Sequence, residues 1–168
     1  MRRPSVKVTL TMAACAAVIA ACTTAPPKPT AKLNDGELAI PADYKSWPRF
    51  LTAVQRPDAK QVRDIYLIPG ADRTKAGDPF PDGTVIVMEN YAAKANADGS
   101  LVTGPDGKLV KGDLLRIFVM GKGEGWGDKT MPELRNGTWI YSAYDGAGKQ
   151  DFIHRYDEYF ATRAKSGY

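Results

Sequence analysis

The middle of the chain carries four apolar stretches that are bounded by turn residues. They cover residues 62–68, 84–91, 114–120 and 138–145, and Pro-Gly, Pro-Asp-Gly and Asn-Gly groups lie beside three of them. Runs of this length and composition between Gly, Pro, Asn and Asp predict β-strands. Residues 101–110 hold Gly-Pro-Asp-Gly between two short apolar runs, which predicts a hairpin.

Two further segments have helical spacing. Apolar residues follow Asp43 at positions 44, 47, 50, 51 and 54, and Pro48 either ends a first turn or begins the helix. Residues 151–164 show the clearest helical pattern of the chain. Most connections between the strands have the length of a turn, which favours antiparallel pairing. The pattern therefore predicts an α+β fold, a mainly antiparallel sheet of about five strands with an N-terminal and a C-terminal helix.

The first residues predict an export signal. Three cationic residues precede an uncharged stretch, residues 8–21, that is too short to span a bilayer comfortably. Residues 19–22, Ile-Ala-Ala-Cys, resemble a bacterial lipobox, in which Cys22 would become the first mature residue and carry lipid. Thr23 then favours the outer membrane, so we expect an exported, periplasmic domain anchored by lipid at Cys22. Ordinary cleavage near Ala14 is the alternative and would release a soluble periplasmic protein.

We divide the chain into a signal peptide (1–21), a proline-rich linker (22–36) and one domain (37–168). Three prolines at positions 26, 27 and 29 favour an extended linker. The leader carries three of the 23 Lys and Arg residues, so the remaining chain is nearly neutral. It keeps no basic tract that would indicate nucleic-acid binding. Both cysteines precede the domain, which therefore cannot form an internal disulfide.

Six segments of the domain together resemble the cytochrome P-460 family, which includes the cytochromes called c′-beta. Their order and spacing carry the resemblance, and they span nearly all of the domain. This resemblance implies an antiparallel β fold that holds a c-type haem, with roles such as hydroxylamine oxidation or nitric oxide binding. Its members are often dimeric, so it also implies a homodimer. The segments are DYKSWPRF (43–50), QVRDIYLIPGA (61–71), FPDGTVIVMENY (80–91), GDLLRIFVMGKGEGWG (112–127), NGTWIYSAYD (136–145) and DFIHRYDEYF (151–160).

The chain departs from that family in two places. Covalent haem c needs two thiols and an adjacent histidine, usually as C-x-x-C-H. The resemblance places this motif between the last strand and the terminal helix, where only residues 146–150 lie here, without cysteine or histidine. It also aligns Met88 with the lysine that cross-links to haem in hydroxylamine-oxidising members, and a thioether cannot form that bond. Both departures speak against hydroxylamine oxidation.

His154 is the sole histidine and the candidate axial ligand if haem binds without a covalent tether. On a helix it would lie about 200° from Phe152, away from the apolar face, which favours a solvated side chain. Met88 and Met120 are soft alternatives, although both lie in apolar runs where core packing is the simpler reading. No catalytic residues and no metal site are predicted, because no nucleophile–base pair and no metal-ligand spacing is present.

Six aromatic residues are candidates for lining a ligand pocket. Strand alternation places Arg116 on one face with Leu114, Phe118 and Met120. Arg116 and Glu89, both charged residues within strands, either face such a pocket or form structural ion pairs. The glycine-rich stretch 121–127 fits no phosphate-loop pattern, and it either packs Trp126 over a cavity mouth or is an irregular connection. The aromatic candidates are Tyr66, Phe80, Tyr91, Phe118, Trp126 and Trp139.

Three hypotheses follow. The first is a periplasmic binding or structural module, not an enzyme, which has lost covalent haem and takes a small apolar or haem-like ligand. The second is a haem protein with non-covalent haem, acting in electron transfer, nitric oxide binding or oxidation of small nitrogen compounds; as an enzyme it would be a haem oxidoreductase. The third is a degenerate copy of a true cytochrome, for which low stability and exposed sheet edges are expected.

Overall fold

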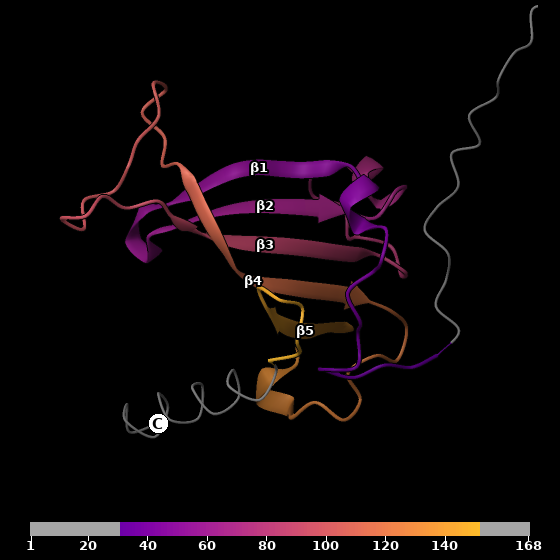
Figure 1. Cartoon of the computed structure of the whole chain (residues 1–168). Coiled ribbons are helices and arrows are strands. Elements are labelled where there is room, and N and C mark those ends of the chain that lie inside the picture. The colour runs from indigo at the N-terminus through magenta and orange to yellow at the C-terminus, as the bar shows by residue number, and fades with distance from the viewer. Residues whose placement is uncertain (1–30, 152–168) are drawn as a thin grey trace, which may run out of the picture.

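A single antiparallel sheet forms the domain in the computed structural model, which describes residues 31–151 (Figure 1). The strands lie side by side in chain order, so the expected antiparallel sheet of about five strands is confirmed. Within the described part, the helices are single 3-10 turns, and none is long and apolar enough to cross a membrane. The strands are β1 (Arg49–Arg56), β2 (Gln61–Leu67), β3 (Val85–Ala93), β4 (Lys111–Lys122) and β5 (Trp139–Asp145), and the turns are η1 (Tyr44–Ser46), η2 (Pro57–Ala59), η3 (Ala71–Arg73) and η4 (Pro132–Leu134).

The expectation of an N-terminal helix after Asp43 is wrong. Only η1 precedes Pro48, and the residues that follow form β1, paired antiparallel to β2. The pairing shifts between Arg49 and Leu51 and again between Leu51 and Val54. Such bulges insert extra residues into a strand and break its two-residue alternation. The apolar residues of this segment are therefore spaced along the sequence as in a helix, although they form a strand. The expected C-terminal helix, residues 151–164, lies outside the described residues except for Asp151.

The predicted hairpin at residues 101–110 is present as a turn that the isolated bridge between Thr103 and Leu109 flanks. A second bridge, between Ala95 and Leu101, encloses the turn before it. The amide of Leu109 also donates to the side-chain oxygen of Gln55 at 2.7 Å. The chain that leads into β4 therefore lies close to β1, and Figure 1 shows the start of β4 crossing the neighbouring strands.

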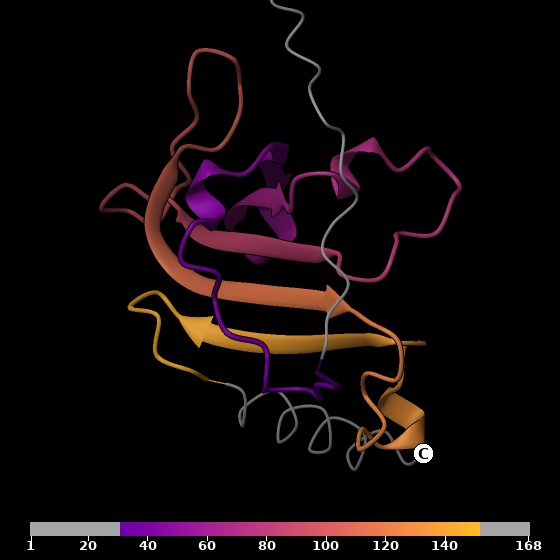
Figure 2. The ribbon, with the colours of Figure 1, turned by 90° about the vertical axis from the view of Figure 1, so that its right-hand side faces the viewer.

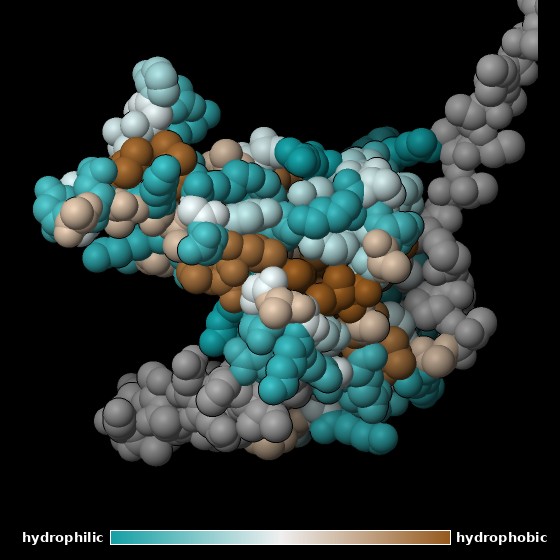
Figure 3. All heavy atoms as spheres, viewed as in Figure 1, coloured by the Kyte–Doolittle hydropathy of each residue, from teal (hydrophilic) through white to brown (hydrophobic). Residues whose placement is uncertain are grey.

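The pleat of the sheet separates two faces, because residues paired directly across antiparallel strands lie on the same side. The inner face carries the core, in which Tyr66, Val87 and Val119 are paired in one row and are buried. Tyr44 and Trp47 of the segment before β1 pack against them. In the view of Figure 1, hydrophobic residues gather over β3 and β4 between polar regions (Figure 3). The outer face carries the alternate residues, which are described with the site below.

The segment before η1 closes the free edge of β5. The Gly36 amide donates to the Tyr141 carbonyl at 2.8 Å, and the Tyr144 hydroxyl donates to the Leu38 carbonyl at 2.7 Å. The indole of Trp126 donates to the Ala31 carbonyl at 2.8 Å and packs where a Cβ on Gly121 or Gly123 would lie. Figure 2 shows this segment crossing β4 and β5. Residues 31–36, assigned to the linker from the sequence, thus make ordered contacts with the domain.

Candidate functional site

The structure divides the six aromatic pocket candidates between the two faces of the sheet. Tyr66, Tyr91 and Trp126 lie on the inner face, whereas Phe118 and Trp139 lie on the outer face. Phe80 contacts Trp139 edge-to-face, with ring centroids 6.1 Å apart. The six residues therefore do not line one cavity. Trp126 is buried against glycines of its own loop rather than over a cavity mouth.

A fully buried carboxylate, Glu89, is the centre of the polar contacts on the inner face. Its Oε1 accepts from the Tyr44 hydroxyl at 2.7 Å and from the Lys45 ammonium. Its Oε2 accepts from the hydroxyls of Tyr66 at 3.1 Å and Tyr91 at 2.8 Å. The Lys45 side chain is 57% exposed and that of Glu89 is 0% exposed, so the cation of this ion pair lies at the surface and the carboxylate lies in the core. Glu89 thus forms a structural ion pair, one of its two predicted roles.

The contacts around Glu89 decide its charge. Burial raises the pKa of its carboxyl, but the hydrogen bonds from Lys45, Tyr44 and Tyr91 outweigh burial and leave the pKa below its usual value. Burial, followed by the hydrogen bond to Glu89, raises the pKa of Tyr44 and of Tyr91. The folded state therefore holds an ionised carboxylate and neutral phenols that donate to it.

A second buried carboxylate lies directly opposite Glu89 in the register. Asp64 accepts from the Ala53 amide at 2.8 Å and from the Lys111 ammonium. Ala53 adopts a left-handed φ of 50°, at the irregular part of β1, which directs its amide to this carboxylate. All acceptors that these two acids offer on the inner face are engaged within the protein, so we assign this cluster to the stability of the fold.

The outer face presents an apolar platform. The register places Ile65, Met88 and Phe118 in one row across β2, β3 and β4. Ile86 and Met120 are paired in the next row, beside Tyr141 of β5. All six side chains are half-buried. We call these six residues the platform; both methionines that the sequence analysis considered as soft ligands belong to it.

A polar row borders the platform. Arg63, Asn90 and Arg116 are paired across β2, β3 and β4, two residues along each strand from Ile65, Met88 and Phe118. Arg116 was expected to share a face with Phe118 and Met120, which is confirmed. Leu114 was expected there too, but the bulge before Arg116 pairs it with Tyr91 on the inner face. Arg116 forms an ion pair with Asp151, with N and O 3.0 Å apart, so it also has a structural partner.

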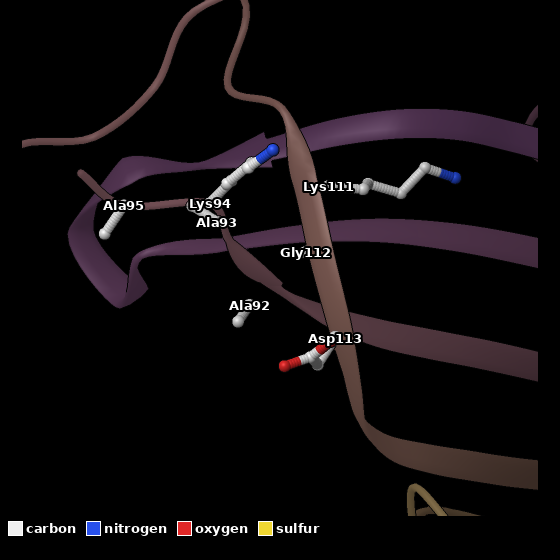
Figure 4. A pocket seen from close by; sticks show the side chains of 7 residues that line it. All are labelled: Ala92, Ala93, Lys94, Ala95, Lys111, Gly112 and Asp113. Carbon is white, nitrogen blue, oxygen red and sulfur yellow. The ribbon is translucent and has the colours of Figure 1, made fainter. Parts of the chain in front are cut away.

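A solvent-open hollow of about 540 Å³ lies beyond the polar row, where β3 and β4 separate (Figure 4). Ala92, which pairs with Gln61, contributes to its wall. Lys94, Lys111 and Asp113 supply its charged groups, and Figure 4 shows their side chains diverging. The charged side chains of the hollow therefore do not converge on one point where a ligand could bind. Among residues 31–151, no group of three or more metal-ligating side chains is placed to hold a metal ion.

Sequence reasoning missed Arg63 and Asn90. A signal existed, because both polar residues occupy positions that alternate in step with apolar neighbours of the same strand, Ile65 and Met88. His154 and Cys22, by contrast, lie outside the described residues, so their expected roles remain predictions.

The chain was compared with known proteins on this basis. A family model described as cytochrome P-460 matches residues 41–164. The match covers the sheet, the platform and the polar row, and extends past the last described residue. No curated protein matches the sequence closely enough to count as a relative.

Replacing the buried acid tests the inner cluster. We expect Glu89→Gln to lower the free energy of unfolding by about 1–3 kcal/mol, because an amide NH₂ would meet groups that all donate. The contribution of Glu89 is complete above the usual pKa of an unfolded glutamate. It disappears as the pH falls through the lowered pKa of the folded protein. Urea unfolding at neutral and acidic pH should therefore show the gap between wild type and variant closing towards acid.

Glu133→Gln is the matched control, since Glu133 is exposed in η4. It should leave stability unchanged at both pH values. Equal stability of wild type and Glu89→Gln at neutral pH would contradict the role given to the cluster.

Proposed function

We propose that this chain, which belongs to the cytochrome P-460 family, is an exported binding domain that holds no covalent haem and takes a small apolar ligand on the outer face of its sheet. The observation that carries the proposal is the platform. Six half-buried side chains from four strands lie there in two neighbouring rows, which also include the buried Leu67 and Ala143. Small-molecule sites are lined mostly by apolar side chains, with a few polar groups that orient the ligand.

Covalent haem does not fit the residues present. Residues 23–153 contain neither cysteine nor histidine. The segment where the family resemblance places the attachment motif is a tight turn, in which the Asp145 amide donates to the Lys149 carbonyl at 2.9 Å. The Asp145 carboxylate accepts from the amides of Ala147 and Lys149, and Tyr144 bridges Gln150. This turn is closed by its own hydrogen bonds, so we derive no redox step for the chain.

Non-covalent haem is the second candidate function, and the two thioethers of the platform favour it. Met88 and Met120 lie in adjacent rows, and thioethers are soft ligands that occur as axial ligands of haem iron. Bound haem would supply electron transfer, nitric oxide binding or oxidation of small nitrogen compounds. His154 stays the other candidate ligand for the same group.

Export and lipidation complete the proposal. The lipobox-like residues 19–22 support a lipid anchor at Cys22 and a place in the periplasm at the outer membrane. Residues 23–30, fully extended, reach about 3.3–3.6 Å each, or roughly 28 Å in all. The anchor would therefore keep the domain within about one domain diameter of the membrane surface.

Binding to the platform can be measured with a neutral apolar probe, N-phenyl-1-naphthylamine, through its fluorescence. We expect Met88→Asp to weaken binding of this probe at least tenfold, because it places a charge in the middle of the apolar surface. Met131→Asp is the matched control, since Met131 is exposed outside the platform. Probe binding that Met88→Asp leaves unchanged, or no binding by the wild type, would refute the proposed site.

The haem state can be read from a visible spectrum of protein purified from haem-sufficient cells. We expect no haem to remain with the polypeptide after acid-acetone extraction, because no thiol is available to form a thioether bond. A Soret band at near-stoichiometric intensity that is lost on extraction would establish the second candidate, and weakening by His154→Ala would identify the ligand. Colour that resists extraction would overturn the proposal.

The anchor is tested by cell fractionation. We expect the wild type in the membrane fraction and Cys22→Ser in the soluble periplasmic fraction, because only the thiol can receive lipid. Cys15→Ser is the control and should remain with the membrane. A wild type found in the soluble fraction would show that ordinary cleavage, the alternative, takes place.

A further inference from the structure

Two buried polar atoms of the outer face lack hydrogen-bond partners within the described residues. They are Nε of Arg63, a donor, and Oδ1 of Asn90, an acceptor. These two residues are directly paired across β2 and β3, and Asn90 is only 4% exposed. Buried polar groups in folded proteins are almost always bonded, because each unpaired group loses its hydration without compensation. The two atoms therefore mark a place where the fold alone does not complete the hydrogen bonding.

The geometry of the pair is fixed by a third residue. The side-chain oxygen of Gln61 accepts from Nη2 of Arg63 at 3.3 Å and from Nδ2 of Asn90 at 3.4 Å. This shared acceptor holds the guanidinium and the amide side by side. It also uses one donor of each residue, so Nε–H and Oδ1 are an unpaired donor and an unpaired acceptor on two directly paired residues.

The charge of Arg63 is not balanced by an acid. Between residues 31 and 151, no carboxylate lies within ion-pair distance of its guanidinium, whereas Arg116 in the same row is paired with Asp151. The nearby acid Asp58 is paired with Arg56, with N and O 2.7 Å apart. Burial, followed by the charge of Arg56, lowers the pKa of Arg63, and the opposing charge of Asp58 does not offset this lowering.

We propose that Arg63 and Asn90 form the head-group site for an apolar acid whose carboxylate lies next to a hydrogen-bond donor, as in an N-acyl amino acid. The inference rests on the proposed function, because it names the ligand class of the same outer face. The carboxylate accepts from Nε–H of Arg63, and the neighbouring N–H of the ligand donates to Oδ1 of Asn90. Each unpaired atom then gains a partner of the opposite kind.

The rest of the face suits the apolar body of such a molecule. Two residues along a strand correspond to about 7 Å, so the row of Ile65, Met88 and Phe118 begins where the head group ends. An acyl chain that leaves the head group in that direction crosses the platform. The hollow beside Ala92 leaves room on the other side for a substituent of the amino-acid part.

The test compares three molecules with the same acyl chain on the wild-type domain by titration calorimetry: N-lauroylglycine, its methyl ester, and laurate. We expect N-lauroylglycine to bind about tenfold or more tightly than its methyl ester, because a charge-assisted hydrogen bond is lost with the ester. We also expect it to bind more tightly than laurate, which lacks the N–H next to the carboxylate. Equal affinity for the acid and its ester would overturn the head-group site.

Two variants assign the preferences to the two residues. Arg63→Lys keeps the charge but removes Nε–H, and it should reduce the preference for the acid over the ester to less than threefold. Asn90→Ala should abolish the preference for N-lauroylglycine over laurate. Arg73→Lys is the control for the first variant, since Arg73 is exposed in η3, and it should change nothing.

Two further readouts separate this site from a structural role and from the proposed function. Arg63→Met should melt no lower than the wild type, because it removes an unpaired donor, and a lower melting temperature with an unchanged acid preference would overturn the inference. If N-phenyl-1-naphthylamine binds as expected but the domain binds N-lauroylglycine no more tightly than its methyl ester, only the head-group site is refuted. If neither binds, both proposals fail.

Discussion

The burial of one charge, that of Glu89, organises the inner half of this domain. A carboxylate at the centre of a sheet with no exposed surface is tolerated only when hydrogen bonds and an opposite charge replace its water. β2 and β3 supply two of the donors, but Tyr44 and Lys45 come from the segment before β1. The same carboxylate thus fastens η1 over the core, and the packing of Trp47 beside it follows from that attachment.

Because the inner face is occupied in this way, the binding that we propose falls on the other face of the sheet. The pleat gives every strand two sets of side chains, and one set is engaged in the core and in the pairs of Glu89 and Asp64. The opposite set includes the platform, the polar row and the buried Leu67, and two of its polar atoms have no hydrogen-bond partner among residues 31–151. Changes of side chains on the outer face can therefore leave the sheet and its core in place, since different side chains form the two faces.

The loss of covalent haem attachment that we propose would be a local change in this structure. The turn after β5 is short, and its backbone amides donate within residues 145–150. The Gln150 side chain also donates to the Gly36 carbonyl. Nothing in the inner cluster depends on it. A cooperative, ordinarily stable domain is therefore expected, in contrast to the degenerate copy that was considered from the sequence.

The sequence by itself determined four of the five strands and their antiparallel pairing, because turn residues and short connections are local signals. It failed at β1, where bulges gave a strand the spacing of a helix, and at Leu114, which a bulge moves to the other face. It named Glu89 and Arg116 as charges needing partners, but not which partners. Only the tertiary structure decided that Arg63 and Asn90 meet and remain partly unpaired, because cross-strand register is set by contacts between residues far apart in the chain.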